Sequence, residues 1–196
     1  MADGTLKVGT ITTSSGSGTI TLGQSGETLS VPSGATLDMS SGTMTLNSSM
    51  KNTPAFFARR IDQGITENSF VKVVFSTEDI DTDNAFDSST GRFTVPSGKA
   101  GKYHFSGVVE IDTSGSLNTV IFLDEVVIYK NGSSVNAVSF WRSNTARYQS
   151  NFYSFAQTLN LAASDYVQLY ARGRTTDGSN VLLQAADFSA HKLIGV

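Results

Sequence analysis

The 196-residue sequence contains no cysteine. Disulfides, thiolate metal sites and cysteine nucleophiles are therefore excluded. Charged residues make up only 16% of the chain and the net charge is -3, so neither nucleic acid nor an anionic membrane is an expected partner. No apolar run approaches the length of a membrane span, so membrane insertion is not expected. The first residues have neither a basic nor a hydrophobic region, so no signal peptide is expected.

Aromatic and basic residues are nearly absent from the start of the chain. The one Trp, six Tyr and twelve Phe all lie at or beyond Phe56, and Lys7 is the only basic residue among the first fifty. Gly, Ser and Thr dominate there instead. This change in composition predicts two domains, a repetitive segment 1–50 and a domain 51–196, with a linker at Asn47 to Ala55.

Short patches that alternate threonine with an apolar residue recur through the first segment every seven to nine residues, separated by Gly- and Ser-rich turns. This is strand chemistry in repeated units. One copy has too little apolar surface to offset the ~1–2 kcal/mol that ordering each residue costs. Copies side by side could share an apolar axis. We predict that residues 5–47 form an intertwined, three-chain β shaft, and a disordered tether is the alternative.

The stretch "GTITLGQSGETLSVPSGATLDMSSGTMTL" resembles the repetitive shafts of tailed-phage virion fibre proteins. The resemblance implies a virion protein on the capsid or tail, which contacts other virion proteins through its N-terminal segment. The missing signal peptide fits assembly in the cytoplasm of a bacterial host.

From Ala55 onward, short strands alternate with clear turns. Candidate strands lie in "SFVKVVFS", "GRFTVPSG", "GKYHFSGVVEI", "TVIFLDEVVIYKNGSSVNAVSFW", "NFYSFAQTLNL", "SDYVQLYARG" and "ADFSAHKLIG". The Asn131-Gly132 pair predicts a tight hairpin. Many short strands at close spacing predict an all-β sandwich or barrel, with Phe93, Tyr103 and Phe105 between two sheets.

The order "TG-x-F-T-x-P…G-x-Y-x-F" resembles the globular head of the complement one-q family, a jelly roll related to tumour necrosis factor. The matching positions are Thr90, Gly91, Phe93, Pro96, Gly101, Tyr103 and Phe105. "VVIYKNG", "SDYVQLYA" and "FSAHKLIG" follow in the family's order, although Ser164 stands where the family has glycine and the "SGKAG" loop is longer. The resemblance covers residues 55–196 and implies a jelly-roll β-sandwich, a homotrimer, a binding role and no enzymatic activity.

The sequence carries no recognisable catalytic motif. No phosphate-binding loop and no G-x-S-x-G elbow is present, and His104 and His191 stand in strands without an evident nucleophile. We therefore expect neither an enzyme nor a bound cofactor. A spike that cleaves polysaccharide would need a pair of carboxylates in a cleft, and no pair stands out.

The stretch "STEDIDTDNAFD" concentrates carboxylates, and its Asp79, Asp81 and Asp83 are spaced by two residues. Such side chains can converge on calcium, which prefers oxygen ligands, and some heads of the resembled family bind calcium. The central glycine and final glutamate of a calcium loop are missing. A solvated acidic loop is the favoured interpretation, with calcium as the alternative.

The stretch "SFWRSNTARYQSNFYSF" holds the only tryptophan and supplies the candidate partner-binding residues Trp141, Arg142, Arg147 and Tyr148. Tyr153 and Phe155 of the same stretch are expected in the core or at a trimer contact.

Taken together, these patterns indicate a trimeric phage fibre or spike whose head binds a host-surface glycan or protein, or a neighbouring virion protein. A capsid decoration protein or head fibre without a receptor is the alternative, and a cellular glycan-binding module is a third.

Overall fold

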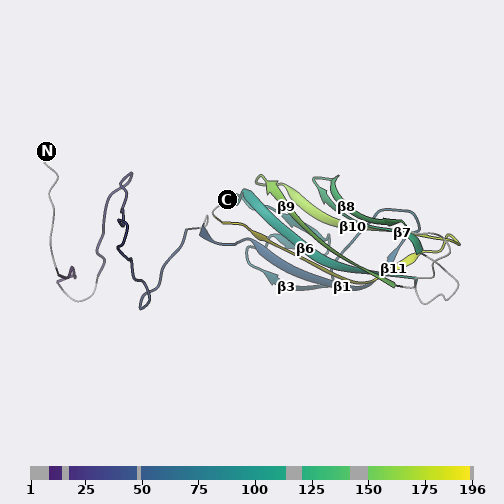
Figure 1. Cartoon of the computed structure of the whole chain (residues 1–196), viewed down its shortest axis with the longest axis horizontal. Coiled ribbons are helices and arrows are strands. Elements are labelled where there is room, and N and C mark those ends of the chain that lie inside the picture. The colour runs from purple at the N-terminus through teal and green to yellow at the C-terminus, as the bar shows by residue number, and fades with distance from the viewer. Residues whose placement is uncertain (1–8, 15–17, 48–49, 114–120, 142–149, 195–196) are drawn as a thin grey trace. The chain divides into compact units, whose positions relative to one another are not determined.

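A computed structural model describes residues 9–14, 18–47, 50–113, 121–141 and 150–194, with all side chains in these ranges except those of 122, 136 and 138–141 (Figure 1). The chain divides into two units, of which the first ends at Thr45 and the second begins at Leu46. In the described ranges, no helix is long and apolar enough to cross a membrane.

The described part of the first unit contains turns but no strand. Backbone bonds close turns at Gln24–Glu27, Pro32–Ala35 and Met39–Gly42, where the sequence predicted them. The alternating apolar side chains of this segment are exposed: Ile11, Ile20, Leu22, Leu29, Val31, Leu37, Met39 and Met44. A single copy thus leaves its apolar residues uncovered, and the three-chain shaft stays a prediction.

The second unit is an all-β sandwich of two antiparallel sheets. Sheet A has the order β3 (Thr77–Asp81), β1 (Ala55–Ile65), β11 (Val181–Lys192), β6 (Gly101–Asp112) and β9 (Ser150–Leu161). Sheet B has the order β4 (Phe86–Asp87), β5 (Arg92–Thr94), β10 (Tyr166–Thr175), β7 (Ile121–Lys130) and β8 (Ser133–Trp141), and β2 (Val71–Lys72) also pairs with β10. The predicted all-β class is therefore confirmed.

Alternating side chains fill the space between the sheets. On β6, Tyr103 and Phe105 are fully buried, whereas His104 and Ser106 lie on the opposite face, as the sequence predicted. Phe93 on β5 is also fully buried. The ring of Phe188 on β11 lies at the centre of this aromatic core. It contacts the rings of Phe56, Phe75, Phe86, Phe105 and Phe155.

The predicted hairpin at Asn131-Gly132 joins β7 to β8, and both residues have positive φ, 50° and 80°. The Asn131 side chain donates to Asp165 over 2.7 Å, and Lys130 pairs with Asp165 at 2.9 Å. These two bonds lower the pKa of Asp165 to about 2. Ser164 has φ 69°, in the left-handed region that favours glycine, which explains why the resembled family has glycine there.

Two predictions of local structure are corrected. The strand expected over Ser69 to Ser76 is formed only at Val71–Lys72. After Lys72, the Gln63 side chain takes the place of a strand partner, donating to the Lys72 carbonyl and accepting from the Val74 N–H. The acidic stretch expected as a loop begins instead as the edge strand β3, which pairs with β1. Strand β1 itself was not singled out from the sequence.

We expect Gly107→Ala to lower the free energy of unfolding by about 1–3 kcal/mol, the usual cost of overpacking a core. A Cβ atom at Gly107 would lie 2.2 Å from the Asp187 carbonyl oxygen and 2.6 Å from the Phe155 ring. Gly64→Ala on β1 is the control, because a Cβ atom there meets nothing within 4 Å. Equal unfolding midpoints in guanidinium for the two variants would contradict the register of sheet A.

Candidate functional site

The acidic stretch uses its carboxylates for structural bonds. Asp79 accepts two hydrogen bonds from Arg59, which lower the pKa of Asp79. Asp83 pairs with Lys99 at 3.0 Å. Burial opposes ionisation of Asp83, but the bonds from Lys99 and Thr82 outweigh it and lower its pKa.

The third candidate, Asp81, closes the turn that follows β3. Its Oδ1 accepts the N–H groups of Asp83 and Ala85, and its Oδ2 accepts the N–H of Phe86 over 2.9 Å. Among the described residues, no group of three histidine, cysteine or carboxylate side chains is arranged to hold a metal ion. The three hydrogen bonds that Asp81 accepts thus explain the conformation of this turn without a metal ion, and calcium binding remains a prediction.

A pocket of about 510 Å³ lies beside this turn, lined by Glu78, Asp83, Asp87 and Arg92 among others. Burial, then the nearby Asp81 and Asp87, raise the pKa of Glu78. The pocket is open to solvent and carries carboxylates on several sides. It therefore has the charge to hold a small cation or polar group, but no described side chain in it is placed as a nucleophile.

Most of the aromatic and basic candidates lie outside the residues that the structure describes. Trp141 ends β8 opposite Leu123, and its side chain lies outside the described set, as do the residues Arg142, Arg147 and Tyr148. Tyr153 and Phe155 are buried in the core.

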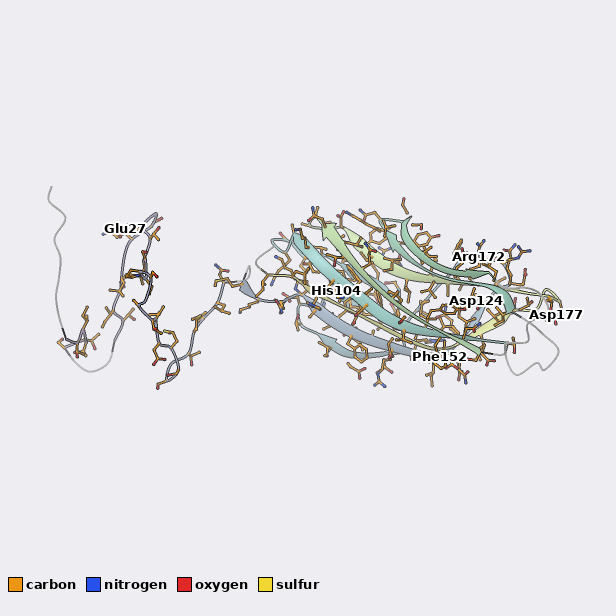
Figure 2. The ribbon with its side chains drawn as sticks, viewed as in Figure 1. Glu27, His104, Asp124, Phe152, Arg172 and Asp177 are labelled. Carbon is orange, nitrogen blue, oxygen red and sulfur yellow. The ribbon has the colours of Figure 1, made fainter. Side chains whose placement is uncertain are left out.

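Tyr153 belongs to a polar link between the sheets. Its hydroxyl donates to the carboxylate of Asp124, which is 1% exposed and is labelled in Figure 2. Asn151 donates to the same carboxylate oxygen over 2.9 Å. Asp124 is on β7 of sheet B, whereas Asn151 and Tyr153 are on β9 of sheet A. The three residues therefore tie the two sheets together and have a structural role.

The outer face of sheet A carries small and apolar side chains among charged ones. Ser106, Ser189 and Ala156 lie side by side across β11, β6 and β9. Four large apolar residues on the strands of this sheet are exposed: Ile61, Ile80, Val108 and Phe152. Phe152, labelled in Figure 2, is 70% exposed. Val108 is the register partner of Asp187 and Ser154, and Phe152 is the partner of Glu110, so the apolar side chains alternate with charged ones. Exposed apolar side chains on a sheet face favour an interface with another protein surface.

The two histidines lie together on the same face. His104 and His191 are register partners on β6 and β11, with ring centroids 5.8 Å apart, and His104 bonds the Thr158 hydroxyl. Neither histidine forms an ion pair with a carboxylate in the part of the chain that is described. The pair therefore has the geometry of a polar border to the apolar face.

The outer face of sheet B carries a cluster of tyrosines. Tyr166 and Tyr170 follow each other at alternate outward positions of β10, and Tyr129 on β7 pairs with Gln168 between them. The rings of Tyr129 and Tyr170 are 4.2 Å apart. The three rings are half-buried, and Gln168 beneath them is only 3% exposed. We call Tyr129, Tyr166, Tyr170 and the neighbouring Phe70 the tyrosine face.

Guanidinium groups border the tyrosine face on two sides. Arg92 lies 4.1 Å over the Tyr166 ring, and Arg172 lies 4.4 Å over the Phe70 ring. Arg172, labelled in Figure 2, also donates to Glu125 over 2.6 Å. These contacts hold the rings in place through cation–π attraction.

The tyrosine face was not identified from the sequence. The alternation in "DYVQLYA" does place Tyr166 and Tyr170 on one face of a strand, and this much is confirmed. The pairing of β10 with β7 adds Tyr129, and the pairing with β2 brings Phe70 next to it. These pairings join residues far apart in the chain, so no local pattern could reveal them.

No protein-family model and no curated protein matches the sequence. Among solved structures, the globular domain of zebrafish complement 1qA protein matches 74% of this chain and 98% of its own, with 17% identity and a TM-score of 0.51. The PRD1 vertex protein P5 matches 73% of this chain and 99% of its own, with 13% identity and a TM-score of 0.49. The first similarity shows that the head shares the fold of that globular domain, as the sequence predicted.

We expect Asp81→Asn to lower the free energy of unfolding by about 1.5–3 kcal/mol, because an amide loses one charged acceptor for the N–H groups of the turn. The loss should be the same with calcium and with EDTA, measured by chemical denaturation. Asp79→Asn is the control from the same stretch. Its pair with Arg59 is exposed to solvent, so its effect should be small. A loss seen only in calcium would instead show that the turn binds the cation.

Proposed function

We propose that this protein is a homotrimeric fibre or spike protein of a tailed-phage virion. The N-terminal segment assembles the trimer and attaches to other virion proteins, and the head is exposed for binding to the host surface or to a virion neighbour. The observation that carries the proposal is the row of exposed apolar residues in the described parts of segment 9–47, which further copies of the chain would cover with the same residues.

The head supplies a second surface for the same assembly. The outer face of sheet A combines small side chains, which allow close approach, with the exposed Val108 and Phe152. Burying apolar surface there contributes about 25 cal/mol per Å². The resemblance of the head to the complement one-q family, whose members are trimers, favours association through the head as well as through the shaft.

Binding rather than catalysis fits the described side chains. The acidic candidates are engaged by Arg59, by Lys99 and by backbone N–H groups, and the histidines lie on the flat face of sheet A. The proposed place of the protein is the virion, as a capsid or tail appendage. Electron microscopy of particles carrying a gold-labelled chain tests that location, and label found on no virion would contradict it.

We expect the full chain to have a mass near three times 20.8 kDa in multi-angle light scattering at micromolar concentration. Val108→Arg should shift the head toward monomer, because three guanidinium groups would be brought into an apolar interface. Val135→Arg on β8 of sheet B is the matched control. The two valines are 41% and 42% exposed, so the two substitutions place an arginine at similarly exposed positions.

A monomeric wild-type chain contradicts the trimer outright. Equal masses for the two valine variants contradict the use of sheet A but leave the shaft as the assembly element. Repeating the measurement on residues 51–196 separates these contributions, since this unit has a core of its own.

A further inference from the structure

We propose that the tyrosine face of sheet B is a binding site for a neutral, pyranose-containing glycan. This inference rests on the proposed function, because it identifies what the head binds and where. If sheet A is covered by neighbouring copies, then the outer face of sheet B is the broad surface that stays open on the head.

The first observation is the state of the tyrosine hydroxyls. The hydroxyls of Tyr103 and Tyr153 in the core donate hydrogen bonds to protein oxygens. Within the described part of the chain, those of Tyr129, Tyr166 and Tyr170 have no hydrogen-bond partner. A surface with three available phenols and the aromatic rings that carry them offers both hydrogen bonds and apolar contact.

The second observation is the rigidity and shape of the face. Its tyrosines stand on two central strands of sheet B, over Gln168 and Val127, which are 3% and 2% exposed. Gln168 is held in turn by a bond from its Nε2 to the Thr90 carbonyl over 3.0 Å. Rings supported in this way lose little conformational entropy on binding, which favours a small ligand of modest affinity.

These features suit the chemistry of a pyranose ring. A pyranose presents C–H groups on its faces and hydroxyls at its edge, so it can stack on a tyrosine ring while hydrogen-bonding the next phenol. Of the four side chains of the tyrosine face, only Phe70 lacks a polar atom, and it is 40% exposed. Tyrosine and arginine are also common at protein interfaces, so a protein partner is the competing occupant that the test below must separate from a glycan.

The charges around the face favour a neutral ligand over an acidic one. Three cations border it, Lys72, Arg92 and Arg172; Glu125 accepts a hydrogen bond from Arg172, and Asp87 is the register partner of Arg92. The guanidinium of Arg172 is paired with Glu125, and that of Arg92 shares its pocket with Asp87 and Glu78. Because two of the three cations have a carboxylate beside them, the face favours a neutral ligand, whose binding should change little between low and high salt.

The test uses the wild-type full chain on an array of defined neutral and acidic oligosaccharides, followed by calorimetry with the strongest neutral ligand. We expect binding to neutral hexose or N-acetylhexosamine glycans, with a Kd that is similar at low and high salt. Tyr129→Ala and Tyr170→Ala should each weaken binding about tenfold or more, the size of one lost contact in a binding site. Tyr170→Phe, which keeps the ring and loses the hydroxyl, should weaken it less.

Light scattering on every variant separates the test of the glycan site from the test of the trimer. Loss of glycan binding with an unchanged mass supports the site, and glycan binding by a chain that proves monomeric supports the site while overturning the proposed assembly. Three results overturn the glycan proposal: a blank array, which leaves a protein partner as the occupant of this face; binding that survives both alanine variants; or salt-sensitive binding confined to acidic glycans.

Discussion

The packing of Phe188 between the two sheets is the constraint on which the rest of the head depends. Its ring lies with its centroid 5.1 to 6.4 Å from five other phenylalanine rings, which come from both sides of the sandwich. The contacts that these rings make are lost if either sheet slides. Gly107 belongs to the same arrangement, because the Phe155 ring occupies the space where a side chain would stand.

Once the inward positions are fixed in this way, strand geometry assigns every alternate residue to an outer face. The two outer faces that result differ in chemistry. On sheet A, the strands place serine, alanine and exposed apolar residues beside Glu110 and Asp187, a mixture that suits contact with another protein surface. On sheet B, they place tyrosines and guanidinium groups together, which suits a ligand with hydroxyl groups. The same packing therefore supports the proposed division between an assembly face and a recognition face.

The N-terminal segment lacks an aromatic core of this kind. It has strand-like alternation and closed turns but no aromatic residue, and in one chain its apolar side chains remain exposed. Since ordering each residue costs ~1–2 kcal/mol, alternation alone cannot hold it in strands. The proposed association of copies would supply this segment with the apolar contacts that Phe188 supplies to the head.

The sequence by itself determined the all-β class, most strands of the head, the hairpin at Asn131-Gly132 and the burial of Phe93, Tyr103 and Phe105, because each follows from local alternation or turn chemistry. It did not reveal strand β1. It also did not reveal that the acidic stretch begins as the edge strand β3, or that Asp79, Asp81 and Asp83 bond to separate partners. Those depend on which strands pair, and a short polar stretch has no period of its own that distinguishes an edge strand from a loop. The tyrosine face likewise exists only through pairing: Tyr166 and Tyr170 share a strand, but Tyr129 reaches them because β7 pairs with β10, and only the tertiary structure decides that.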